Sequence, residues 1–140
     1  MKNLFLISLT AIIFISCTKQ NAASTAPADD NVDSATAVLK YSGTFEQGRE
    51  GTVSGIANIY LKGSKYQLEL KDFSVTNGPD LHVYLAQETD GIHFIELGKL
   101  KSTNGNEVYD IPGTPDFSTY KYVLIYCQQY SVLFGSSALK

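Results

Sequence analysis

From Val38 onward, apolar and polar side chains alternate with a period of two residues. Strands that bury one face show this pattern, because successive side chains point to opposite faces of a sheet. The alternation is clearest over residues 52–61, 66–71, 81–86 and 122–127. In the last stretch both sets of side chains are apolar or aromatic, which predicts a central strand that is covered on both faces.

Turn signals rich in Gly, Pro and Asn separate these stretches. They are Gln47-Gly48, Lys62-Gly63-Ser64, Asn77-Gly78-Pro79-Asp80, Asp90-Gly91, Asn104-Gly105-Asn106 and Pro112-Gly113-Thr114-Pro115. About eight short strands at roughly ten-residue spacing predict one all-β domain over residues 38–140. We expect an antiparallel β-sandwich or a barrel-like sandwich, without a helix of normal length.

Residues 1–16 have the composition of a signal peptide. Lys2 provides a positive start, and a mostly apolar run follows from Leu4 to Ile15. The run is shorter than the about 20 residues that span a bilayer, but it fits the apolar core of a signal peptide. Ser16-Cys17 at its end resembles the cleavage site of a bacterial lipoprotein, in which the cysteine becomes the lipidated first residue. The alternative is a secretory peptide cleaved elsewhere, which would leave Cys17 as a spare thiol.

Lipidation at Cys17 would anchor the chain to a membrane of the cell envelope, since two acyl chains already hold a protein stably on a bilayer. Thr18 follows without the Asp that resembles an inner-membrane retention signal, which favours the periplasmic face of the outer membrane. After Cys17, residues 18–37 contain no aromatic residue and only Val32 among the large aliphatic residues. Such a segment cannot bury a core. We therefore expect residues 17–37 to be a lipidated cysteine followed by a flexible tether.

Composition excludes several classes of function. The net charge is −3, from 11 basic and 14 acidic residues, and no cluster of Lys and Arg indicates nucleic-acid binding. Two cysteines and two histidines are too few for a dedicated zinc or iron–sulfur site. The sequence has no phosphate-binding glycine loop and no Gly-x-Ser-x-Gly or His-Glu-x-x-His motif. We predict no catalytic residue and no metal site.

His82, Asp80 and the tyrosines are candidates that structural roles also explain. His82 is out of phase with Leu81 and Val83, so we expect it on the second face of its strand. Asp80 is typical of a turn, where Asp accepts backbone hydrogen bonds, and cation binding is its alternative role. The 9 tyrosines suit a sheet surface. Their alternative role is an aromatic binding surface or a path for electrons.

Cys127 has no cysteine partner within the chain if Cys17 carries lipid. Unpaired thiols outside the cytoplasm become oxidised, so this residue needs either protection or a redox role. Protection would come from burial, because Cys127 is in phase with Val123 and Ile125 and would pack as a small apolar residue. A redox role would need the thiolate, and therefore a positive neighbour from another strand. His82 is the candidate for that neighbour or for a second ligand.

Four segments resemble the DM-thirteen family, a small extracellular β-sandwich that is also called the electron-transfer DM domain. They are YSGTF at 41–45, LKDF at 70–73, NGPDLHVYL at 77–85 and VLIYCQQYSVLFG at 123–135. The family's characteristic cysteine maps onto Cys127, and its frequent preceding Trp is Tyr126 here. The resemblance extends over residues 38–140 and implies a redox role for Cys127, as a bare thiol or by holding a group such as haem.

Two functional hypotheses follow for this envelope lipoprotein. The first is an electron-transfer module that acts through Cys127 on a redox or protein partner in the envelope, with His82 as a possible ligand. Because no Cys-x-x-Cys-His motif is present, its cofactor would be a non-covalent haem or none. The second is a non-enzymatic binding module in which Cys127 is a buried structural residue.

Overall fold

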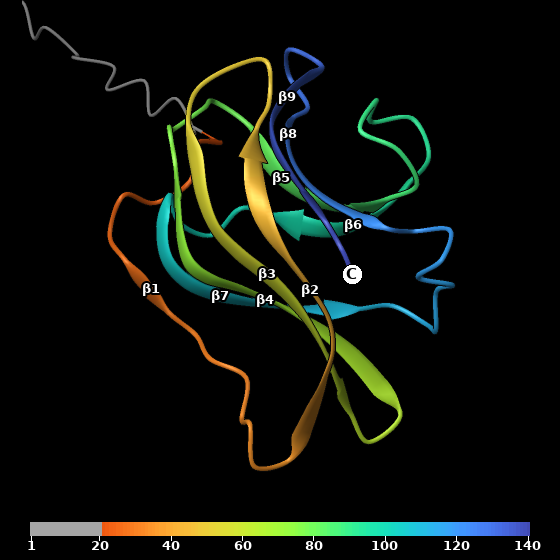
Figure 1. Ribbon diagram of the computed structural model, residues 1–140. Coiled ribbons are helices and arrows are strands. Elements are labelled where there is room, and N and C mark those ends of the chain that lie inside the picture. Colours follow the sequence, from red (N-terminus) through yellow and green to blue (C-terminus); the bar gives the residue numbers. More distant parts are fainter. Residues whose placement is uncertain (1–20) are drawn as a thin grey trace, which may run out of the picture.

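Nine strands form one continuous sheet in the computed structural model, which describes residues 21–140 (Figure 1). They are β1 (Ala28–Asp29), β2 (Ala37–Gln47), β3 (Val53–Lys62), β4 (Lys65–Val75), β5 (Leu81–Ala86), β6 (Phe94–Lys99), β7 (Asn104–Ile111), β8 (Tyr122–Cys127) and β9 (Val132–Ala138). Their order across the sheet is β1-β7-β4-β3-β2-β9-β8-β5-β6. Neighbouring strands are antiparallel except for β1 and β7, which are parallel. The predicted all-β class is confirmed.

Strand β2 is where the sheet folds over into two layers. Residues 37–44 of β2 pair with β3, whereas its last three residues, Phe45–Gln47, pair with β9. The first layer therefore contains β1, β7, β4, β3 and the start of β2, and the second contains the end of β2, β9, β8, β5 and β6. Figure 1 shows the layers curling around a shared interior. The result is a barrel-like sandwich, as the sequence predicts.

Apolar side chains from both layers fill this interior at alternating positions, as the period of two predicts. The residues that are almost completely buried there include Ala57, Ile59, Leu68, Leu70, Leu81, Val83, Leu85, Val123, Ile125 and Cys127. Each large aliphatic side chain contributes about 1.5–3 kcal/mol on full burial. A second apolar cluster, formed by Tyr84, Ala86 and Leu124, lies on the other face of β5 and β8. Both faces of β8 are therefore covered, and its predicted central position is confirmed.

The segment before β2 differs from the flexible tether that the sequence predicts over residues 17–37. From residue 21 the structure places this segment along the sheet, where Ala28 lies opposite Gly105 in the parallel pairing of β1 with β7. Ser24 donates its backbone N–H to the Lys101 carbonyl at 3.1 Å, and its own carbonyl accepts from the Thr103 amide at 2.8 Å. The main chain makes these contacts, so small polar side chains do not prevent docking. Residues 17–20, including Cys17, lie outside the described residues.

Side chains add to the docking of this segment. Ser102 Oγ donates to the Ala26 carbonyl at 2.6 Å, and Asn104 Nδ2 donates to the Thr25 carbonyl at 3.1 Å. The segment thereby covers the edge of β7, which would otherwise present unpaired backbone groups to water.

Glycine at position 105 is required for this docking. Gly105 has a φ of 103°, and a Cβ built on it would lie 2.1 Å from the Ala28 carbonyl oxygen. Gly105→Ala should therefore displace β1 from β7. We expect faster hydrogen exchange at the amides of residues 24–30 and earlier proteolytic cleavage in that segment.

Gly113→Ala is the matched control. Gly113 also has a positive φ, 68°, but a Cβ there would meet nothing within 4 Å. It carries a comparable backbone cost of about 1–2 kcal/mol without touching the segment. Equal exchange rates at residues 24–30 in the two variants would contradict the docked arrangement.

Candidate functional site

His82 lies on the outer face of β5 between two carboxylates. Its Nδ1 is 2.6 Å from Glu96 Oε1, and its Nε2 is 3.1 Å from Asp80 Oδ1. The His82 side chain is only 5% exposed, and Lys99 Nζ lies 4.0 Å from the same Asp80 oxygen. Asp80 therefore holds the imidazole as well as forming part of a turn. Both ring nitrogens are engaged, so the ring is oriented rather than open for a ligand.

Cys127 lies on the inner face at the end of β8. It is 0% exposed and is a free cysteine, paired in register with Leu81 of β5. It belongs to the main core cluster together with Val123 and Ile125. The buried position that its phase predicts is confirmed. Its redox role stays a prediction.

The structure does not bring His82 and Cys127 together. Leu81 faces the interior with Cys127, whereas His82 lies opposite Tyr126 and faces outward. Alternation along a strand separates the two side chains by the thickness of the sheet. The suggestion that His82 activates the thiol, or shares a ligand with it, is therefore wrong for this arrangement. A haem held by both residues does not fit, and no group of three His, Cys, Asp or Glu within residues 21–140 is placed to hold a metal ion.

An aromatic stack covers the outer face beside His82. The Tyr84 ring lies 3.8 Å from Phe94 between centroids, nearly parallel at 9°, and 5.5 Å from Tyr126. Gln128 Nε2 donates to the Tyr84 hydroxyl oxygen at 2.7 Å. Burial raises the pKa of the Tyr84 phenol above its usual 10.0. Phe94 is 36% exposed whereas Tyr84 is only 2% exposed, so the stack leads from the protein surface to a buried phenol.

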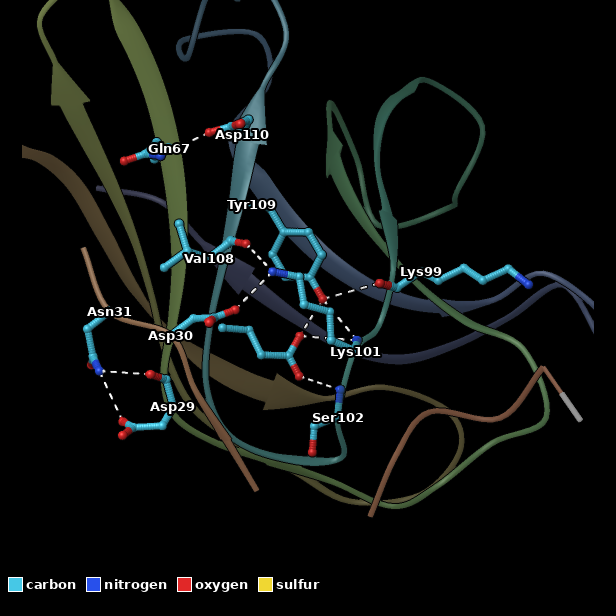
Figure 2. A network of polar contacts seen from close by, with 11 residues as sticks. Asp29, Asp30, Asn31, Gln67, Lys99, Lys101, Ser102, Val108, Tyr109 and Asp110 are labelled. Carbon is cyan, nitrogen blue, oxygen red and sulfur yellow. Dashed lines mark hydrogen bonds and ion pairs between the residues drawn. The ribbon is translucent and has the colours of Figure 1, made fainter. Parts of the chain in front are cut away.

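A polar cluster that was not predicted from the sequence lies on the interior face of β7. Glu107 is 0% exposed and lies in register with Leu70 of β4. Its Oε1 accepts from the Ser102 amide at 2.6 Å. Its Oε2 accepts from the Lys101 amide at 3.3 Å and from the Tyr109 hydroxyl. Figure 2 shows this network around Tyr109, Lys101 and Ser102. One signal was available, because Glu107 is in phase with Tyr109 and Ile111 and so shares their buried face.

The electrostatics of this cluster follow from its burial. Burial raises the pKa of the Glu107 carboxyl above its usual 4.5, and the hydrogen bonds from Tyr109, Ser102 and Lys101 oppose that rise. Burial also raises the pKa of the Tyr109 phenol far above its usual value, and the negative charge of Glu107 adds to the effect. Lys101 Nζ lies 4.8 Å from the centroid of the Tyr109 ring and 3.0 Å from Asp30 Oδ2.

A comparison with known protein families shows to which family the chain belongs. Residues 44–139 match the model of the DM13 family, described as electron transfer DM13. The chain belongs to the DM13 family. The resemblance seen in the sequence is thereby confirmed, and the docked residues 21–37 precede the part of this DM13 protein that the family model matches. No curated protein and no solved structure matches the chain. Within residues 21–140, no helix is long and apolar enough to cross a membrane.

The stability of the fold should depend on the ionisation of Glu107. An unfolded Glu loses its proton near pH 4.3, whereas folded Glu107 keeps its proton to a higher pH. Between these two pKa values the folded state binds more protons than the unfolded state. The free energy of unfolding should therefore fall as pH rises through the folded pKa. Urea unfolding at a series of pH values measures this fall.

Two variants isolate the contribution of Glu107. Glu107→Gln should lose this component of the pH profile, while Glu46→Gln, at an exposed position on β2, should keep it. An unchanged profile in Glu107→Gln would show that the carboxyl is not perturbed by burial.

The burial of Cys127 predicts slow thiol labelling. In the folded chain the thiol should react only when the sandwich opens, because its sulfur lies in the apolar core. Cys127→Ala should cost about 1 kcal/mol of stability, the scale of one buried methylene. Mass spectrometry after timed exposure to an aromatic disulfide reagent, in a Cys17→Ser background, measures the rate. Labelling that is complete within the mixing time would contradict the buried position.

Proposed function

We propose that this DM13 protein is an electron-transfer module that is anchored in the cell envelope by lipid on Cys17. The observation that carries the proposal is the match of residues 44–139 to a family described by electron transfer. The barrel-like sandwich supports it, because a densely packed β interior holds buried side chains in fixed positions. Fixed positions suit one-electron transfer, because the barrier to the transfer is low when the protein rearranges little.

The docked segment determines how the anchor would hold the domain. Asn21 Oδ1 accepts from Lys99 Nζ at 3.0 Å, at one end of β6. Cys17 is four residues before Asn21, and four fully extended residues span at most about 14 Å. A lipid on Cys17 would therefore keep the Lys99 end of the domain close to the membrane, instead of letting the domain stand clear of it.

The opposite end of β5 and β6 would then face away from the membrane. His82 pairs with Lys99 near the anchor, whereas Ala86 pairs with Phe94 at the far end. Ile92 and Phe94 are exposed there, beside the aromatic stack. This end is our proposed contact for a redox or protein partner in the envelope, because aromatic and aliphatic side chains are typical of interface centres.

Cys127 is the first candidate for the redox group. Complete burial prevents disulfide exchange with a partner, since exchange requires direct attack by a thiolate on sulfur. A buried thiol could still exchange single electrons with a partner over a distance, and we assign this redox chemistry to Cys127. The same burial favours the second hypothesis, a binding module in which Cys127 only packs.

Voltammetry of the full-length lipidated chain on an electrode separates these hypotheses. We expect a reversible one-electron signal from the wild-type protein. Its loss in Cys127→Ala would assign the signal to the thiol, and its persistence would assign it to another group. A folded wild-type protein without any signal would contradict the electron-transfer proposal and favour the binding module.

The anchor is tested separately by membrane fractionation. Cys17→Ser should move the protein from the membrane fraction to the soluble fraction of the envelope, because the acyl chains supply the binding energy. Ser16→Ala, which keeps a small residue before the cysteine, should remain in the membrane fraction. Equal partitioning of Cys17→Ser and the wild type would contradict lipidation at Cys17.

A further inference from the structure

We propose that Tyr109 and Glu107 form a proton-coupled redox pair, in which Tyr109 gives up one electron while its phenolic proton moves to Glu107. The proposal rests on the proposed electron-transfer function and assigns it a redox group. The two residues lie on the interior face of β7, and the Tyr109 hydroxyl donates to Glu107 Oε2.

The geometry supplies what a phenol needs for oxidation at neutral pH. A phenol that loses an electron becomes strongly acidic, so its oxidation is easier when a base already accepts its hydrogen bond. Glu107 occupies that position, and the amides of Lys101 and Ser102 hold its carboxylate in place at 3.3 Å and 2.6 Å. A positioned proton acceptor of this kind accelerates proton transfer about 10²–10⁴-fold.

The step balances within the pair and one partner. Tyr109–OH and Glu107–COO⁻ become the neutral radical Tyr109–O• and Glu107–COOH, and one electron leaves. The O–H bond of Tyr109 breaks while the O–H bond of Glu107 forms. The electron goes to a strongly oxidising one-electron acceptor, which we assign to the class of high-valent metal centres, such as a ferryl haem, carried by a partner protein. On return of an electron the proton moves back, and both residues are restored.

Burial protects the radical that this step produces. Tyr109 is 5% exposed and Glu107 is 0% exposed, so neither water nor a second phenol reaches the pair readily. From β4, the apolar Leu68 and Leu70 lie directly opposite the two residues. From β6, Gly98 lies beside the ring of Tyr109.

Two charged groups outside the pair, Lys101 and Asp30, lie near it. Lys101 Nζ lies 4.8 Å from the centroid of the Tyr109 ring and also donates to the Val108 carbonyl at 2.6 Å. A cation near the ring stabilises the reduced, electron-rich phenol. Asp30 of the docked segment pairs with Lys101 at 3.0 Å and offsets part of this effect (Figure 2). Docking of residues 21–37 thereby adjusts the charge around the pair.

Tyr84 provides the internal comparison. It is buried as deeply as Tyr109, but Gln128 Nε2 donates to its oxygen, and an amide group is no proton acceptor at neutral pH. Tyr84→Phe is therefore the matched control for Tyr109→Phe, because each substitution removes one buried hydroxyl.

The test uses the full-length chain in detergent with photogenerated tris(bipyridine)ruthenium(III) as the one-electron oxidant. Time-resolved absorption and electron paramagnetic resonance record the phenoxyl radical. We expect a long-lived radical in the wild type and in Tyr84→Phe, and its loss in Tyr109→Phe. Glu107→Gln should slow its formation about 100-fold, because the amide cannot take the proton. The wild-type rate should fall at low pH, with the same midpoint as the Glu107 component of the unfolding profile.

Incorporation of 3-fluorotyrosine at position 109 covers the case in which a variant fails to fold. The fluorine keeps the hydroxyl group and adds a hyperfine splitting to the radical signal if the radical is on residue 109. A long-lived radical without this splitting, or an unchanged rate in a folded Glu107→Gln, would overturn the assignment. If the voltammetric signal of the wild type persists in that case, electron transfer stands with another redox group. If that signal is absent too, the proposed function fails with it.

Discussion

A carboxyl group buried in the interior of the sandwich is the constraint on which much of this structure depends. An unpaired carboxylate in an apolar core costs several kcal/mol, so Glu107 requires donors that are fixed in place. Tyr109 and the amides of Lys101 and Ser102 are those donors. They hold the connection between β6 and β7 in one conformation. The segment that precedes β2 pairs with that connection, through Ser24, so one buried group links the core to the docked N-terminal residues.

This arrangement gives the domain two different ends. One end of β6 contacts the start of the described chain through Lys99, and the other carries Phe94 at the exposed side of the aromatic stack. The interior pair on β7 lies inside the sandwich at the first of these ends, because the Tyr109 hydroxyl also lies 3.3 Å from the Lys99 carbonyl. Its burial is useful for a protein that exchanges electrons, because side reactions with solvent are avoided.

Much of the fold could be predicted from the sequence, because burial follows the period of two. Leu81, Val83 and Cys127 occupy the interior positions that their phase predicts. The suggested pairing of His82 with Cys127 failed for the same physical reason. Residues of one strand alternate between faces, and only the register, in which Leu81 lies opposite Cys127, reveals which residues meet.

Two further features were not predicted, each for its own reason. Residues 21–37 dock through main-chain hydrogen bonds, and side-chain composition carries no signal for such contacts. Glu107 has a charged side chain, which is typical of the exposed face of an alternating strand. Its phase with Tyr109 nevertheless puts it on the interior face of β7. Its burial depends on the donors from Lys101 and Ser102, which belong to a connection whose conformation the sequence pattern does not specify.

The central claim is that Glu107 is a buried carboxylate that serves as proton acceptor for Tyr109. A carbon-13 NMR titration of the Glu107 carboxyl in the full-length chain tests it most directly. Burial raises the pKa of this carboxyl above the usual 4.5. Because three donors face its two oxygens, we predict that the group is ionised at pH 7 and that the Lys101 and Ser102 amide signals shift at the same midpoint. A carboxyl that stays protonated through pH 7, or one that titrates with an unshifted pKa and leaves both amides unaffected, would contradict the account.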